Sequence, residues 1–240
     1  MSLPHGQQTP IFASYCIDER YDELASEFLR QTLGRRSYYI GTNAGAALCL
    51  GYDASCRAIR CGGGSSSSNK AGSGCCPGTT EMRKLKRAFN TNFAIALTLK
   101  PITVVYLLNH QDCGAIRAFL PCSGYPAKSA SDGPAEVCIN ARILAAGQRS
   151  VLKEFPRMSV VVGLLDANGT VANYDVEART WTIVFLGQGC ERTGLWHGRT
   201  LGERVTYDCR RCQDPTQSSA RTRQQPVAGD QSVHLDFFCA

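Results

Sequence analysis

Short apolar runs alternate with longer amphipathic stretches along most of the chain before residue 190. The runs are rich in β-branched side chains and are bounded by polar or glycine residues, which is typical of buried strands. The run from Ile102 to Leu108 is apolar at nearly every position, which indicates a strand buried on both faces of a parallel sheet. Asn168-Gly169 predicts a tight hairpin turn. The predicted strands cover residues 11–16, 37–40, 102–108, 158–165 and 180–186.

Between these strands, apolar side chains recur at the spacing of one helical face. The clearest example runs from Tyr21 to Leu33, and Gly34 follows it directly, as a glycine often does at the end of a helix. Two further helices are predicted over residues 81–100 and 135–155. Alternating strands and helices predict the α/β class, with a mostly parallel central β-sheet flanked by helices.

Two stretches depart from this pattern. Residues 52–80 contain the low-complexity run Gly62 to Ser68, which we interpret as part of a flexible Gly/Ser-rich surface insertion. Residues 213–240 are dominated by polar side chains and are predicted to be a poorly ordered tail. The chain of 240 residues is long enough to bury one sizeable core, so residues 1–212 are predicted to form a single domain.

Composition narrows the function classes. The N-terminus has no secretory signal and no apolar stretch is long enough to span a membrane, so an intracellular, cytoplasmic protein is expected. The net charge of +6 is modest, and the basic runs lack interleaved aromatic side chains, which favours a solvated surface over nucleic-acid binding. The cysteines number 13, an odd count in a chain without an export signal, which favours free thiols and metal ligands over a disulfide framework.

Candidate metal ligands stand where two of the predicted strands end. Cys16 ends the first strand, while His110 and Cys113 follow the long apolar run. Because the carboxyl ends of strands form the binding crevice of open α/β sheets, these side chains are expected to meet. Two thiolates and an imidazole are ligands that Zn²⁺ prefers, and three protein ligands leave the fourth position open, as in catalytic sites. The sequence therefore predicts a zinc site at Cys16, His110 and Cys113.

A charged pair accompanies the first ligand. Asp18 can accept a hydrogen bond from a metal-bound water, and Arg20 can keep that carboxylate ionised. On its own the pair would be interpreted as an ordinary ion pair at a helix start, but beside metal ligands the functional interpretation is favoured. Asp112 is interpreted as a cap of the helix that follows His110.

These motifs resemble those of the β-class carbonic anhydrases. That family carries Cys-x-Asp-x-Arg after its first strand and His-x-x-Cys-Gly after a later one, and both patterns are intact here. The family's Asn-Ala-Gly segment is matched by Asn43-Ala44-Gly45, and the resemblance covers roughly residues 8–187. The chain departs from the family at Thr42, where arginine is usual, in the Gly/Ser-rich insertion and in the cysteine-rich C-terminal stretch.

The resemblance implies a β-carbonic-anhydrase-like fold and a zinc-dependent lyase. Such an enzyme hydrates CO₂ reversibly to bicarbonate by a zinc-bound hydroxide, with Asp18 and Arg20 as the catalytic pair that controls the fourth zinc position. The resemblance also implies a state in which Asp18 itself binds zinc, and a backbone N–H of Gly114 near the substrate oxygens. It further implies a homodimer or a higher homo-oligomer.

Other interpretations stay open at this point. The departure at Thr42 and the insertion are compatible with the same fold hydrolysing CS₂ or COS, whose geometry is like that of CO₂. Alternatively, the zinc is structural and Asp18 is a permanent fourth ligand. A second group is compatible with a structural Cys₃His zinc site, although reduced thiols or a reversible disulfide are favoured. Its members are Cys190, His197, Cys209 and Cys212.

Overall fold

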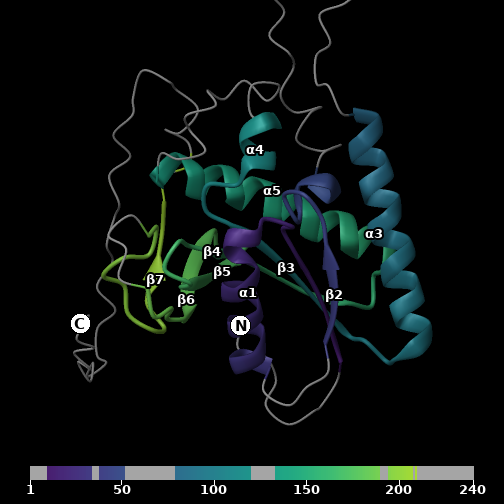
Figure 1. Ribbon diagram of the computed structural model, residues 1–240, viewed down its shortest axis with the longest axis horizontal. Helices are drawn as coiled ribbons and strands as arrows, with labels where there is room; N and C mark the ends of the chain where they lie inside the picture. Colours follow the sequence, from purple (N-terminus) through teal and green to yellow (C-terminus); the bar gives the residue numbers. More distant parts are fainter. Residues whose placement is uncertain are drawn as a thin grey trace, which may run out of the picture.

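The computed structural model describes residues 10–33, 38–51, 79–119, 133–189, 194–207 and 209. The strands of this part of the chain are β1 (Ile11–Tyr15), β2 (Tyr38–Thr42), β3 (Val104–His110), β4 (Ser159–Leu165), β5 (Val171–Asp175), β6 (Thr180–Phe185) and β7 (Arg204–Val205). The helices are α1 (Glu19–Leu33), α3 (Thr79–Leu99), α4 (Gly114–Phe119) and α5 (Gly133–Glu154). Figure 1 shows these helices around one central sheet.

The strands form a mixed sheet in the order β2-β1-β3-β4-β5-β6-β7. The first four strands in this order are parallel, and β5, β6 and β7 each pair antiparallel with the strand before them. The predicted α/β class is therefore confirmed. The hairpin turn is also confirmed, because β4 and β5 are antiparallel and Gly169 between them has a φ of +82°. The short strand β7 was not predicted from the sequence.

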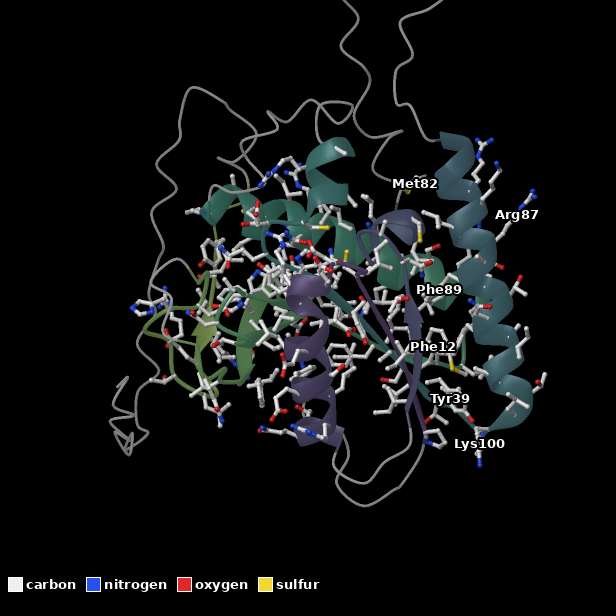
Figure 2. All side chains as sticks on the ribbon, in the orientation of Figure 1. Phe12, Tyr39, Met82, Arg87, Phe89 and Lys100 are labelled. Carbon is white, nitrogen blue, oxygen red and sulfur yellow. A yellow bond between two sulfur atoms is a disulfide. The ribbon has the colours of Figure 1, made fainter. Side chains whose placement is uncertain are left out.

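Side chains of alternate residues along β1 enter two separate cores, as the strand periodicity requires. Ile11 packs in the cluster that holds Phe28 of α1, whereas Phe12 packs in the cluster of α3 and α5. The Phe12 ring lies with its centroid 5.6 Å from that of Phe89 (Figure 2). The distance between the ring centroids of Phe12 and Phe93 is 4.9 Å. All residues of β1 and β3 are buried, which explains the continuous apolar runs.

The remaining sequence expectations fall partly outside the described residues. Gly34, residues 52–78 of the expected insertion and the whole tail 213–240 lie there, whereas residues 79 and 80 belong to the start of α3. No helix among the described residues is both long and apolar enough to cross a membrane.

One pair of cysteines contradicts the expectation of free thiols. Cys138 of α5 forms a disulfide with Cys209, and their Cα atoms are 5.2 Å apart. Cys209 therefore does not offer the thiolate that the second zinc group required. Of the other members of that group, His197 is exposed, while Cys190 and Cys212 lie outside the described residues. The pairing was not predictable, because 71 positions separate the two cysteines along the chain.

Candidate metal centre

The predicted ligands stand at the carboxyl ends of two neighbouring parallel strands. Cys16 directly follows β1 and His110 is the last residue of β3, while Cys113 directly precedes α4. The strands β2 and β3 lie on opposite sides of β1, so the chain leaves β1 in one direction and returns on the other side. A crevice for ligands forms at this kind of reversal in open α/β sheets. The topology thus brings together residues that lie far apart in the sequence.

The three ligand atoms converge at this point. The sulfurs of Cys16 and Cys113 and a ring nitrogen of His110 all lie within 4.8 Å of one another, and all three residues are buried. The two sulfurs are 3.9 Å apart. Two thiolates on one tetrahedral Zn²⁺, with Zn–S bonds of about 2.3 Å, would lie about 3.8 Å apart. The spacing therefore fits a shared metal ion, and the predicted convergence of the three residues is confirmed.

The imidazole of His110 is oriented for metal binding. Its Nδ1 lies 2.7 Å from the backbone oxygen of Gln111, so we assign the proton to Nδ1, which donates to this carbonyl. Nε2 then carries a lone pair, and it is buried without a hydrogen-bond partner among the described residues. The ring of Tyr21 packs over the imidazole with centroids 4.1 Å apart. A buried ring nitrogen left free while the other donates is the arrangement of a metal-binding histidine.

The segment after β2 supplies a backbone donor to the first thiol. The N–H of Gly45 donates to the sulfur of Cys16 at 3.2 Å. Gly45 has a φ of +72°, and a Cβ at this position would lie 2.9 Å from Cβ of Leu48. Both observations require glycine here. The Asn43-Ala44-Gly45 motif therefore contributes to the site through the backbone rather than through a side chain.

The two thiols differ in acidity because they share one environment. The pKa of Cys16 lies below its ordinary value, mainly because the thiol of Cys113 stabilises its thiolate, with a further hydrogen bond from the N–H of Gly45. The pKa of Cys113 is raised, because its proton is held by the Cys16 sulfur and because the thiol is buried. The two thiols therefore titrate as a coupled pair, in which the Cys16 thiolate forms more readily than that of Cys113.

This pairing predicts the proton balance of metal binding. Because the Cys16 thiolate forms readily, Zn²⁺ binding at neutral pH should release fewer than the two protons that ordinary thiols would lose. Isothermal titration calorimetry in buffers of different ionisation enthalpy measures this number. The Cys49→Ala variant, which lacks a separate buried thiol, should give the same value. Release of two protons would contradict the lowered pKa of Cys16.

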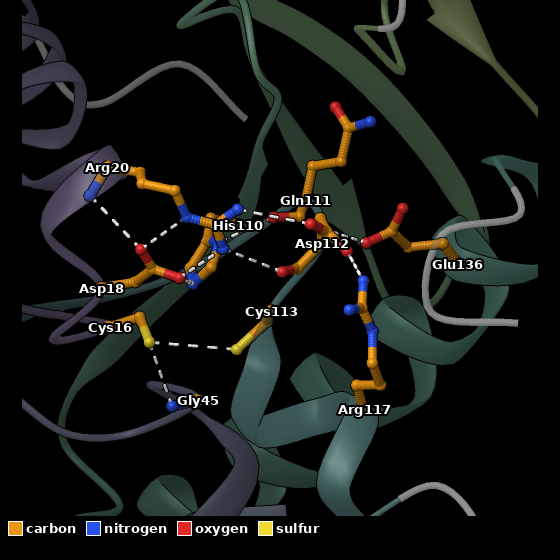
Figure 3. A network of polar contacts seen from close by, with 10 residues as sticks. All are labelled: Cys16, Asp18, Arg20, Gly45, His110, Gln111, Asp112, Cys113, Arg117 and Glu136. Atoms are coloured by element: carbon orange, nitrogen blue, oxygen red, sulfur yellow. Dashed lines mark hydrogen bonds and ion pairs between the residues drawn. The ribbon is translucent and has the colours of Figure 1, made fainter. Parts of the chain in front are cut away.

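The charged pair lies beside the ligand atoms. Arg20 donates to Asp18 through Nε at 2.9 Å and through Nη2 at 2.7 Å, so both carboxylate oxygens are engaged (Figure 3). This bidentate contact with the guanidinium is the main reason that the pKa of Asp18 is lowered. Oδ2 of Asp18 is also 3.8 Å from Nε2 of His110. An ionised carboxylate thus stands next to the three candidate metal ligands.

Asp112 and Gly114 belong to the segment that carries His110 and Cys113. The carboxylate of Asp112 contacts the guanidinium groups of Arg20 and Arg117, a role that the interpretation as a helix cap missed. No local signal reveals it, because Arg20 lies 92 residues away. Gly114 is the exposed first residue of α4, with open space around the position of a Cβ. Its substrate-binding role stays a prediction.

These residues together can hold a divalent metal ion with one position facing a carboxylate. Such an arrangement suits the activation of water and its delivery to an electrophile. Comparisons of the chain with protein-family models, with curated proteins and with solved structures find no match.

Proposed function

We propose that this protein is a zinc-dependent carbonic anhydrase of the β type, which hydrates CO₂ reversibly to bicarbonate. The observation that carries the proposal is the buried Cys16–His110–Cys113 group with the Asp18–Arg20 pair directly beside it. The motif resemblance adds support, because the residues that carry it are the ones that meet in space.

The donor set favours zinc over the common metals that prefer oxygen ligands. Thiolate ligands discriminate against Mg²⁺ and Ca²⁺, which prefer oxygen, and Zn²⁺ accepts sulfur and imidazole together in a tetrahedron. Three protein ligands leave one coordination position. The carboxylate of Asp18 lies beside the ligand atoms, with Oδ2 3.8 Å from Nε2 of His110. It therefore borders the open coordination position.

Each residue has a defined task in the proposed reaction. Bound zinc would supply a Lewis acid that lowers the pKa of a water molecule toward about 7. Asp18 accepts a hydrogen bond from the attacking water and orients it, and the bidentate contact with Arg20 keeps this carboxylate anionic. Because the Nδ1 proton of His110 is held by a backbone carbonyl, the ring keeps a single orientation throughout.

The surroundings of the ligands are largely apolar on the side of α1. A small cavity borders Cys16 and His110 on the side of α1. Apart from Asn109 and these two ligands, its walls are aromatic and aliphatic, formed by Tyr15, Tyr21, Ala25, Leu108 and Leu165. The cavity has a volume of about 10 Å³, which is room for about one water molecule, so it is not itself a binding site for CO₂. Its apolar walls favour an uncharged substrate without a net dipole, such as CO₂, over a charged one.

Stopped-flow measurement of CO₂ hydration tests the proposal. Zinc-loaded protein should hydrate CO₂ on the order of 10³-fold or more faster than the Cys16→Ala variant, because loss of the thiolate removes the metal. The Cys49→Ala variant, which also lacks one buried thiol but no ligand, should retain the full rate.

Zinc content decides what a negative result means. Protein that binds one zinc per chain and hydrates CO₂ no faster than Cys16→Ala would refute the enzymatic proposal while leaving the metal centre in place. Sulfide release from CS₂ or COS by the same zinc-loaded protein would instead assign a different substrate to this site.

A further inference from the structure

Arg20 contacts two carboxylates, that of Asp18 close by in the sequence and that of the distant Asp112. It holds Asp18 through two hydrogen bonds of 2.9 and 2.7 Å. Its Nη1 also lies 3.3 Å from Oδ2 of Asp112, and its Nη2 donates to the backbone oxygen of Asp112 at 3.2 Å. Figure 3 shows the guanidinium between the two acidic residues. The guanidinium therefore keeps a negatively charged partner even when Asp18 turns away.

Asp112 is itself held from two further sides. Its second carboxylate oxygen contacts the guanidinium of Arg117 on α4, and its backbone N–H donates to the carboxylate of Glu136 on α5. The residue has a φ of +54°, an uncommon conformation for a residue other than glycine. These contacts fix Asp112 between two arginines, which share its charge.

Asp18 has two competing partners in this geometry. Its Oδ2 accepts from Arg20 and is at the same time 3.8 Å from Nε2 of His110. An ion bound to Nε2 at about 2 Å would lie within reach of the same oxygen after a small rotation of the side chain. Either Arg20 holds Asp18 and the ion keeps an open position, or Asp18 occupies that position.

We propose that Asp112 is a positioning residue that sets this balance by competing with Asp18 for Arg20. When Asp18 leaves Arg20 to bind the ion, Arg20 stays paired with Asp112, so the change costs less free energy. Arg117 opposes this effect, because it also forms an ion pair with the Asp112 carboxylate. The proposal rests on the metal site of the proposed function. Because the side chains of Arg20 and Asp112 are 54% and 33% exposed, the effect is that of a partly solvated ion pair.

Azide binding to the Co²⁺-substituted chain of 240 residues measures the open fraction without any activity assay. Azide needs the open position, so its apparent dissociation constant is the intrinsic one divided by that fraction. At one fixed neutral pH, Asp112→Asn should lower the apparent constant about two- to fivefold, because Arg20 then holds Asp18 alone. Arg117→Gln should raise it by a similar factor, because Asp112 becomes fully available to Arg20.

The Glu27→Gln variant is the matched control. It removes a carboxylate that is also paired with an arginine, Arg30, but on the exposed surface of α1, and it should leave azide binding unchanged. Unaltered azide affinity in Asp112→Asn, or shifts of the same sign in Asp112→Asn and Arg117→Gln, would overturn the proposal. Absence of thiolate-to-Co²⁺ charge-transfer absorption in the unmodified protein would instead refute the metal site.

Discussion

Replacing Cys113 with serine is expected to abolish stoichiometric zinc binding. The variant removes one sulfur of the pair that is 3.9 Å apart and leaves Cys16 and His110 as the only close ligands of the group. Even removal of a residue that merely orients a ligand lowers metal affinity about 10- to 100-fold. Loss of a ligand should therefore cost at least about 100-fold, measured by competition with a chromophoric chelator.

The matched control is Cys49→Ser, which makes the same chemical change at another buried thiol. It should bind zinc as the unmodified protein does. Far-ultraviolet circular dichroism of both metal-free variants separates loss of a ligand from loss of the fold. Retention of one tightly bound zinc per chain by folded Cys113→Ser protein would show that the Cys16–His110–Cys113 assignment is wrong.

The position of this group was predictable because it depends on local patterns. The apolar run before His110 marks a buried strand, and the short spacing to Cys113 places both ligands at the end of that strand. The alternation of strands and helices then implies parallel pairing, which brings the end of β1 to the end of β3. The position of the group therefore depends on strand pairing, and not on a contact between particular distant side chains.

The surrounding network was not predictable, because it depends on which distant side chains meet. The contact between Arg20 and Asp112 arises only once β1 and β3 lie side by side. The disulfide between Cys138 and Cys209 likewise joins α5 to a segment beyond β7, and neither cysteine has a local pattern that names its partner. Hydrophobic periodicity fixes which face of an element is buried, and says nothing about such polar pairs.

The strand at the edge of the sheet was likewise not predictable from the sequence. The strand β7 contains only Arg204 and Val205, too few residues for a repeating pattern. Its pairing with β6 is accompanied by packing of Trp196 against Trp181, whose ring centroids are 5.4 Å apart. Tertiary contact therefore accounts for this strand, whereas β1 and β3 are evident from their composition.

Replacing Asp18 with asparagine is expected to reduce the rate of CO₂ hydration about 10²- to 10⁴-fold, the usual contribution of a positioned proton acceptor. Asparagine has nearly the same shape and keeps one acceptor oxygen, but it carries no charge and its amide nitrogen cannot accept a hydrogen bond from water. Stopped-flow kinetics with zinc-loaded protein measures the rate. Glu27→Gln, which neutralises a surface carboxylate of α1 paired with Arg30, should leave it unchanged.

Zinc affinity of the same variant separates the two roles that Asp18 can have. In the catalytic proposal, Arg20 holds Asp18 beside an open position, so Asp18→Asn should retain zinc with nearly unaltered affinity while the rate falls. If Asp18 is instead a permanent fourth ligand, the substitution removes a charged donor, so zinc affinity must fall. In that case the unmodified protein has no CO₂-hydration activity for the substitution to reduce. Two results together would therefore establish a closed structural site and refute the enzymatic proposal: the unmodified protein does not hydrate CO₂, and Asp18→Asn binds zinc more weakly than the unmodified protein does.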